Sequence, residues 1–350
     1  MRVIKSLSEV LAQQQYDTIA IDIYGVIHNG EKPYPYTKEA LRSLVTIGEQ
    51  VILLSNSTRL SHVLSEHLSD GFDIPSDSYK AILSSGELTR LYLEDCAEYL
   101  RTGDIVQEHC EGTMQGNKLI GPLSFAQHYL KTGRFVLLGS TDWHAPLYSN
   151  VMPTIQPSNE ASLEEVDFIL LGSVTTMDFP LFEGKTVDPY SEKSVIAYFT
   201  PFLEACLRRQ LPLLCANPDV WAPYGFNADG SQKLLICPGY IGEMYENMGG
   251  QVLYFGKPCA SIYDFLLRMN VSDEKMHNAS DRRVLCIGDN VATDVLGATS
   301  AGLDVAMVIG GVHSEELNQQ EEEELKQQVR ALCQKFNSKE PTYLIPLLKY

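Results

Sequence analysis

Short apolar runs alternate with amphipathic segments along most of the chain. The amphipathic segments, such as Thr37–Ile47, Glu192–Arg209 and Ala260–Met269, have the spacing of helices with one buried face. The apolar runs predict β-strands at Thr18–Ile23, Gln50–Leu54, Arg134–Leu138, Phe168–Leu171, Pro212–Ala216, Val252–Phe255, Val284–Ile287 and Val305–Ile309. This alternation is typical of α/β folds with a mostly parallel sheet. Ligands of such sheets bind beyond the carboxyl ends of the strands, so the residues there are the first candidates for a functional site.

The middle of the chain, residues 86–239, has predicted strands and helices of its own and separates two groups of strand-end motifs. We therefore predict a domain of residues 86–239 inserted into a core made of residues 1–85 and 240–350. Two stretches rich in small residues, Ser84-Ser85-Gly86 and Pro238-Gly239-Tyr240-Ile241-Gly242, are predicted to be the hinges. The acidic segment Glu315–Gln328 is predicted to form a solvated helix near the C-terminus.

Composition narrows the class of protein. A chain of 350 residues with 44% hydrophobic and 21% charged residues can form two globular domains with a large core. The net charge of −18 argues against nucleic acids and anionic membranes as partners. Eight scattered cysteines without a C-x-x-C pair favour reduced thiols over disulfides or a zinc site. The chain has neither a signal-peptide core nor an apolar run of membrane-span length, so we expect a cytoplasmic protein.

Two of the predicted strands in the first part of the chain end in polar residues. Asp22 follows the apolar run Ile19-Ala20-Ile21, and a carboxylate at the end of a buried strand is costly unless it has a partner or a function. It could serve chemistry or simply cap the following loop. In "VILLSNSTR", the strand runs into Ser55-Asn56, where a hydroxyl and backbone N–H groups suit a phosphate oxygen. The alternative is that these residues only cap the next helix.

Two later strand ends add a lysine and a pair of carboxylates. Lys257 follows a strand and a glycine in "VLYFGKPCASIYDFLL" and could neutralise a phosphate, or could lie on the surface. In "VLCIGDNVATDVLGATSAGL", Asp289 follows the strand directly and Asp294 comes five residues later. Oxygen ligands at this spacing indicate magnesium, with Asp289 as a direct ligand and Asp294 nearby. The alternative is two acids placed at a helix N-terminus by the helix dipole.

The ordered series Asp, Ser, Lys, Asp–Asp resembles the haloacid dehalogenase-like superfamily, and in particular its class IIA branch of NagD-like and pyridoxal phosphate phosphatase-like hydrolases. The stretches "GGQVLYFGKP" and "GDNVATD" are similar to the third and fourth motifs of that family, and "IGGVHSEEL" to its last core strand and helix. The stretch "CANPDVWAP" resembles the Asn-Pro-Asp signature of the cap. The resemblance implies a Rossmann-like, doubly wound parallel-sheet core with an inserted α/β cap domain.

The resemblance also implies a reaction. Asp22 would attack the phosphorus of a phosphomonoester and form an aspartyl-phosphate, which water then hydrolyses. The implied Mg²⁺ ligands are Asp22, the backbone carbonyl of Tyr24, and Asp289, with Asp294 close by. The implied phosphate-binding residues are Ser55, Asn56 and Lys257. This division of labour suits phosphoryl transfer, which depends on positioning and on neutralising the phosphoryl oxygens.

Tyr24 departs from the family pattern, because phosphatases of this superfamily usually carry an acid/base aspartate two residues after the nucleophile. A phenol with a pKa near 10 is a poor general base at pH 7, and losing such a group costs about 10²- to 10⁴-fold in rate. His28 could substitute, or could be a loop histidine at the site rim. Asp219 could reach the site from the cap, or Asn217 and Asp219 could fix cap geometry or contact substrate. A good leaving group, such as an acyl or aryl phosphate, would need no acid.

Three functions remain open from the sequence. The first is a Mg²⁺-dependent hydrolase of a small phosphorylated metabolite, such as a sugar phosphate. The second, motivated by Tyr24, is a catalytically slow or inactive protein that binds a phosphorylated ligand or partner. The third is a phosphotransferase, which no residue separates from a hydrolase. Relatives often dimerise through the cap, so a homo-oligomer is open as well. Asp142 and His144 in "GSTDWHAP" have no partner nucleophile, and we expect a loop with a packed Trp143 there.

Overall fold

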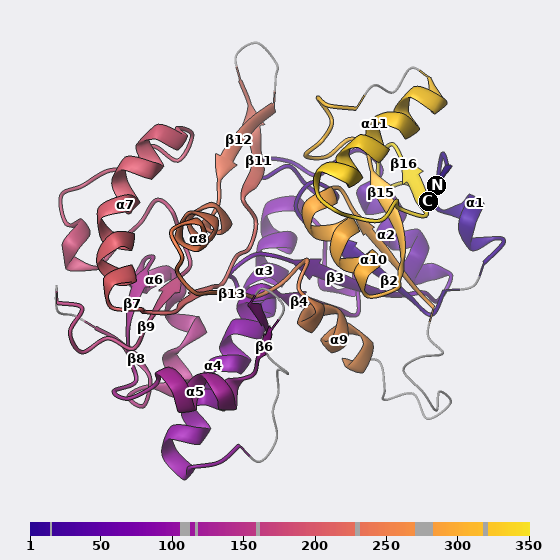
Figure 1. The fold of residues 1–350 in the computed structure, drawn as a ribbon. Helices are drawn as coiled ribbons and strands as arrows, with labels where there is room; N and C mark the ends of the chain where they lie inside the picture. Colours follow the sequence, from indigo (N-terminus) through magenta and orange to yellow (C-terminus); the bar gives the residue numbers. More distant parts are fainter. Residues whose placement is uncertain are drawn as a thin grey trace.

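The computed structural model describes residues 1–350 apart from positions 15, 106–112, 116–117, 159–161, 228–231, 270–282 and 318–320. The larger of its two main sheets is parallel throughout and has the strand order β1-β16-β15-β14-β2-β3-β4 (Figure 1). Its strands are β1 (Arg2–Val3), β2 (Thr18–Asp22), β3 (Gln50–Ser55), β4 (Ala81–Ser84), β14 (Val284–Gly288), β15 (Asp304–Val308) and β16 (Tyr343–Ile345). β2, which carries Asp22, lies between β3 and β14 in the interior of this sheet.

Helices cover both faces of the larger sheet. Ile19 and Ile21 of β2 join an apolar cluster with one set of helices, and Ala20 between them joins the cluster on the other face. The first set is α1 (Ser8–Leu11), α2 (Thr37–Thr46) and α3 (Ser61–Phe72), and the second is α9 (Ala260–Met269), α10 (Leu296–Ser300) and α11 (Glu322–Lys335). The predicted doubly wound, Rossmann-like α/β core is therefore confirmed.

The second main sheet is also parallel, with the strand order β13-β10-β9-β7-β8. Its strands are β7 (Arg134–Leu138), β8 (Gln156–Pro157), β9 (Phe168–Leu171), β10 (Leu213–Cys215) and β13 (Val252–Tyr254). The helices of this part are α4 (Ser85–Thr102), α5 (Pro122–Tyr129), α6 (Thr141–His144), α7 (Glu192–Arg208) and α8 (Pro238–Asn247). Two hairpins complete it: β5 (Thr113–Gln115) with β6 (Lys118–Ile120), and β11 (Trp221–Phe226) with β12 (Gln232–Ile236). One apolar cluster continues from the larger sheet into this part, so the two sheets share buried side chains.

All eight predicted strands are present, and their ends agree to within one residue. The three predicted helices are present as α2, α7 and α9. The acidic C-terminal helix differs from the prediction, because α11 begins at Glu322 and continues to Lys335. Leu325, Val329 and Leu332 are buried, so this helix packs one face on the core and is not solvated all round. Positions 318–320 of the predicted helix lie outside the described residues.

The sheet pairing of β13 differs from the one that the predicted domain division implies. Residues 240–350 were assigned to the core, but β13 pairs with β10 in the smaller sheet, and α8 packs in the same apolar cluster as α7. A short apolar run has the same appearance in either sheet, and only its hydrogen-bond partner distinguishes them. We propose that the inserted domain begins at α4, as the prediction had it, and continues through β13, with the core resuming near Gly256.

The cysteines and the possibility of a membrane span were two points raised by the composition. The seven cysteines of the described part are free thiols, six of them buried. Among the described helices, none combines the length and the apolar character that crossing a membrane requires.

Candidate active site

The predicted strand-end residues converge on one cavity. Asp22 is the last residue of β2, Ser55 is the last of the neighbouring β3, and Asp289 follows β14 on the other side. Lys257 and Asp294 line the same cavity, which has a volume of about 230 Å³. Parallel strands bring their carboxyl ends to one edge of the sheet, which explains why residues far apart in sequence meet here.

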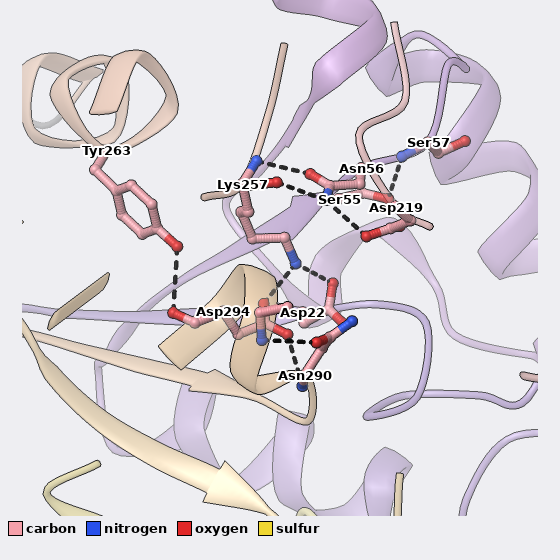
Figure 2. A network of polar contacts seen from close by, with 10 residues as sticks. Asp22, Ser55, Asn56, Ser57, Asp219, Lys257, Tyr263, Asn290 and Asp294 are labelled. Carbon is pink, nitrogen blue, oxygen red and sulfur yellow. Dashed lines mark hydrogen bonds and ion pairs between the residues drawn. The ribbon is translucent and has the colours of Figure 1, made fainter. Parts of the chain in front are cut away.

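Lys257 connects the two halves of this cluster. Its side chain is 2% exposed, and its ammonium group forms ion pairs with Asp22 and with Asp294 Oδ1, the latter at 2.7 Å (Figure 2). The two carboxylates and burial act in opposite directions, and the net effect raises the pKa of Lys257 well above its ordinary value. Lys257 therefore stays charged in a buried position.

Asn56 fixes the backbone that carries Lys257. Its Oδ1 accepts a hydrogen bond from the Lys257 N–H at 2.8 Å, and its Nδ2 donates to the Lys257 carbonyl at 2.9 Å. Gly256 has φ +100°, and a Cβ there would lie 2.5 Å from Asn56 Oδ1, so only glycine allows this approach. Asn56, which follows β3, thus positions Lys257.

Asp22, Asp289 and Asp294 form a buried carboxylate cluster. One ligand oxygen from each lies within 4.8 Å of the others. Burial and the neighbouring carboxylates raise the pKa of Asp22 well above its ordinary value and that of Asp289 to about 7. Hard divalent cations prefer such oxygen ligands, and a cation would offset the repulsion that raises these pKa values. The residues present therefore fit Mg²⁺.

The two later aspartates are held differently. Asp289 accepts one hydrogen bond, from the Val312 N–H to Oδ2 at 2.6 Å. Asp294 lies on a π-helical turn, Val291–Val295, and both of its oxygens are engaged: Oδ1 by Lys257 and Oδ2 by the Asn290 N–H at 3.1 Å. Because both oxygens of Asp294 are engaged, it stays our prediction that Asp289 is the direct ligand and Asp294 a nearby support.

The backbone after Tyr24 lies against Asp289. Gly25 has φ +96°, and a Cβ at this position would lie 2.1 Å from Asp289 Oδ2. The sharp turn at Gly25 therefore brings main-chain atoms to the carboxylate cluster. This close approach supports the expectation that the Tyr24 carbonyl contributes to the metal site.

The Tyr24 phenol is enclosed by its own loop. Its hydroxyl lies 3.4 Å from the Asn29 carbonyl oxygen, and a Cβ at Gly30 would lie 2.1 Å from the same hydroxyl. Burial raises the pKa of Tyr24 well above its ordinary value of 10.0. The phenol therefore remains protonated at neutral pH and is an even weaker acid or base than a free tyrosine.

His28 is a buried wall residue and not a rim residue. Its ring is 3% exposed and stacks on Phe72 at 4.0 Å, and its Nδ1 accepts a hydrogen bond from the Gly30 N–H. Burial lowers the pKa of His28 to about 3, so the ring is neutral at pH 7 with its proton on Nε2. This weighs against His28 as the substitute acid/base and leaves it as a hydrogen-bond donor to a ligand.

Asp219 reaches the core from the cap. Its Oδ1 accepts a hydrogen bond from Asn56 Nδ2 at 2.9 Å, and its N–H donates to Asn217 Oδ1 at 2.9 Å. Both cap residues line the cavity that contains Asp22. Burial raises the pKa of Asp219 to about 6, against the opposing effect of Lys257. The Asn-Pro-Asp signature therefore contributes a carboxylate whose proton equilibrium lies near neutral pH.

Sequence reasoning missed part of the cavity wall. The additional lining residues include Arg59 after β3, His67 on α3, and Trp221, Tyr224 and Leu235 from the β11–β12 hairpin. Arg59 belongs to the quoted "VILLSNSTR" stretch, but spacing alone did not indicate where its side chain points. Trp143, expected to be packed, is 56% exposed and covers Arg59, whereas His144 beside it is buried.

Two family models match segments of the chain. A family model described as haloacid dehalogenase-like hydrolase matches residues 19–117, and one described as HAD-hydrolase-like matches residues 254–334. Together these segments span just over half of the chain. No curated protein sequence matched the chain.

Solved structures share the whole fold at low sequence identity. A haloacid dehalogenase-like hydrolase from Brucella suis has 22% identity and a TM-score of 0.66, covering 99% of this chain and 100% of that one. A possible sugar phosphatase from Cytophaga hutchinsonii has 19% identity and a TM-score of 0.62, with coverages of 99% and 98%. A glycerol phosphate phosphatase from Mycobacterium tuberculosis, solved with magnesium, has 18% identity and a TM-score of 0.51, with coverages of 97% and 76%. The chain belongs to the haloacid dehalogenase-like hydrolases.

Proposed function

We propose that the protein is a Mg²⁺-dependent hydrolase of small phosphomonoesters, such as sugar phosphates, that acts through an aspartyl-phosphate on Asp22. The observation that carries the proposal is the buried ion-pair cluster in which Lys257 joins Asp22 to Asp294, beside Asp289 and Ser55 in one cavity. Burying these charges is costly unless they act together. Phosphoryl transfer is the chemistry that needs such a set.

The residues of the chain have separable roles in this proposal. The Asp22 carboxylate attacks phosphorus, and Lys257 orients that carboxylate and neutralises phosphoryl oxygens. The Ser57 N–H donates to Ser55 Oγ at 3.1 Å, which leaves the Ser55 hydroxyl hydrogen free to donate to a phosphoryl oxygen. Asn56 holds the Lys257 backbone, so its contribution to phosphate binding is partly indirect.

Mg²⁺ would be held by Asp22, Asp289 and the Tyr24 carbonyl, with Asp294 behind them. When bound, it supplies positive charge between the nucleophile and the phosphoryl oxygens and so lowers their mutual repulsion. The buried carboxylate cluster supports this assignment, as does the magnesium complex of the glycerol phosphate phosphatase with the same fold.

Asp219 is our proposed acid/base in place of the aspartate that Tyr24 replaces. Its Oδ1 is bound to Asn56, and its Oδ2 has no hydrogen-bond partner within the described part of the chain. A pKa of about 6 lets it donate a proton to the leaving oxygen and then accept one from water at neutral pH. This favours turnover over the alternative of a binding protein without activity, which Tyr24 alone would favour.

Asp219→Asn is expected to lower kcat/KM about 10²-fold for alkyl phosphates. Because the proton-donating form of Asp219 is lost as pH rises through about 6, wild-type kcat/KM for these esters should fall above that pH, and the variant should not show this fall. For para-nitrophenyl phosphate, whose leaving group needs little protonation, the fold-loss in kcat/KM should be at least about ten times smaller. A pH–rate profile with both ester types is the measurement, and an equal loss for both would contradict the role.

Wild type and Tyr24→Asp, compared by phosphate release with and without Mg²⁺, test the function itself. We expect wild type to turn over at least one small phosphomonoester only with Mg²⁺. Tyr24→Asp should raise that rate by no more than about tenfold, since Asp219 already supplies the proton. A silent wild type together with an active Tyr24→Asp would overturn the proposal and favour the binding-protein alternative.

A further inference from the structure

We propose that the wall of the cavity around Arg59 is a subsite for a second anionic group of the substrate, a carboxylate or a second phosphate. The natural substrate would then be a small phosphomonoester whose carbon skeleton carries another anion. This rests on the proposed function and adds a substrate class to it. The Arg59 subsite is defined here as Arg59, Tyr24, His28 and His67, all of which line the cavity.

Arg59 lines the cavity, and its guanidinium has no acidic partner among the described residues. Within the described part of the chain, no carboxylate forms an ion pair with it, including the four aspartates of the cavity. Arg90, which is also partly buried, is by contrast paired with both Glu87 and Glu94. Burial lowers the pKa of Arg59, but a guanidinium stays charged at neutral pH. A partly buried cation without an acidic partner is unfavourable, and a ligand anion would offset that cost.

The side chain and backbone of Arg59 are already held in place. Its Cζ lies 4.6 Å from the ring centroid of Trp143, a residue of the cap helix α6. Stacking occupies a face of the guanidinium and leaves the N–H groups at its edge available for an anion. The Arg59 N–H donates to Ser57 Oγ at 3.2 Å, and its carbonyl accepts from Ser84 Oγ at 2.7 Å. Little ordering would therefore be needed when a ligand binds.

The neighbours of Arg59 are neutral and do not compete for its charge. Burial lowers the pKa of His67, so its ring is neutral at pH 7. His28 contributes an imidazole that accepts a hydrogen bond from the Gly30 N–H, Tyr24 contributes a phenol, and neither is a carboxylate. An aspartate at position 24 would add a negative charge to this wall. The tyrosine thus has a physical rationale, since it keeps the subsite free of internal carboxylates.

The proposal assigns different charges to two parts of the cavity wall. The catalytic part contains the carboxylates and Lys257, and the Arg59 subsite contains one guanidinium and neutral rings. Arg59 follows Ser55 by four residues in the loop between β3 and α3, so one short segment contributes to both parts. A cavity of about 230 Å³ fits a short carbon chain between the two anions. Carboxylate and phosphate both match the planar fork of arginine.

Three esters of matched length test the subsite: propyl phosphate, 3-(phosphonooxy)propanoate and propane-1,3-diyl bisphosphate. With Mg²⁺, we expect wild type to prefer one or both of the doubly anionic esters over propyl phosphate by at least about tenfold in kcat/KM. Arg59→Met should lower kcat/KM for the preferred ester by about 10- to 100-fold and leave propyl phosphate within about threefold. For the preferred ester, the kcat/KM of Arg59→Lys should lie between the values of wild type and Arg59→Met, since lysine keeps the charge but not the planar fork. The two doubly anionic arms identify which anion is bound.

Arg208→Met, at the exposed end of α7 and outside the cavity, is the matched control and should change none of the three values. An equal loss for all three esters in Arg59→Met would overturn the subsite, as would a wild type without preference. If wild type releases no phosphate from any ester, the proposed function has failed instead. Thermal unfolding with the same three compounds then decides the subsite: stabilisation by a doubly anionic ester that Arg59→Met abolishes supports it, and equal responses overturn it.

Discussion

Asp22→Asn is expected to lower kcat by about 10⁴-fold or more. An amide is not a nucleophile towards phosphorus, so no aspartyl-phosphate can form. The same change removes a metal ligand and one of the two ion-pair partners of Lys257. Phosphate release at saturating substrate and Mg²⁺ measures the loss, and intact-mass analysis of rapidly quenched wild type checks for the phosphorylated enzyme.

The folded state should survive this substitution. Burial raises the pKa of Asp22, so at neutral pH its ionised form is less favourable in the folded than in the unfolded protein. The amide has nearly the same shape and removes that cost, and Lys257 keeps its ion pair with Asp294, so without metal the thermal unfolding temperature should change little. Asp142→Asn, on the exposed helix α6, is the matched control and should keep wild-type kcat. Retention of more than a tenth of wild-type kcat by Asp22→Asn would place the nucleophile elsewhere.

Hydrophobic periodicity predicted the interior strands because each is a continuous apolar run buried on both faces. The strands that were not predicted include β1 and β8, with two residues each, and β16, with three, which are too short for a pattern. The assignment of β13 shows the other limit. Local sequence indicated a strand, but whether it pairs with β10 or with a core strand depends on contacts that no local pattern contains.

For the candidate site, the sequence predicted which residues lie together but not how their side chains are oriented or buried. Residues at strand ends could be placed together because parallel strands end at one edge, and the cavity contains each of them. Side-chain direction and burial could not be read in this way. His28 was expected at the rim of the site, but it is buried in the cavity wall. The sequence pattern did not indicate that Arg59 lines the cavity. The Asn56 contact with Asp219 joins two segments separated by more than half of the inserted domain.

Lys257→Met is expected to lower kcat by about 10³-fold, because it removes a preorganised charge from the phosphoryl oxygens and releases the nucleophile. Met fills most of the aliphatic volume, so the change mainly removes the ammonium group. Lys193→Met, on the exposed face of α7, is the matched control and should keep wild-type kcat. A Lys257→Met variant that retains kcat within tenfold would show that the buried ion pairs serve stability alone.

The same variant should also lose stability in a pH-dependent way. Attraction to Asp22 and Asp294 raises the pKa of Lys257, so its ion pairs contribute stability at neutral pH, below the ordinary lysine pKa. Without them, two buried carboxylates lack a counter-charge, and we expect the free energy of unfolding to fall by about 3–5 kcal/mol at pH 8 in the absence of metal. The loss should shrink at pH 5, because Asp22 and Asp289, whose pKa values are raised, take up protons as the pH falls. Mg²⁺ should restore part of the stability at pH 8, since it supplies the missing positive charge. Denaturant unfolding at both pH values, with and without Mg²⁺, measures this, and a pH-independent loss would contradict the electrostatic origin.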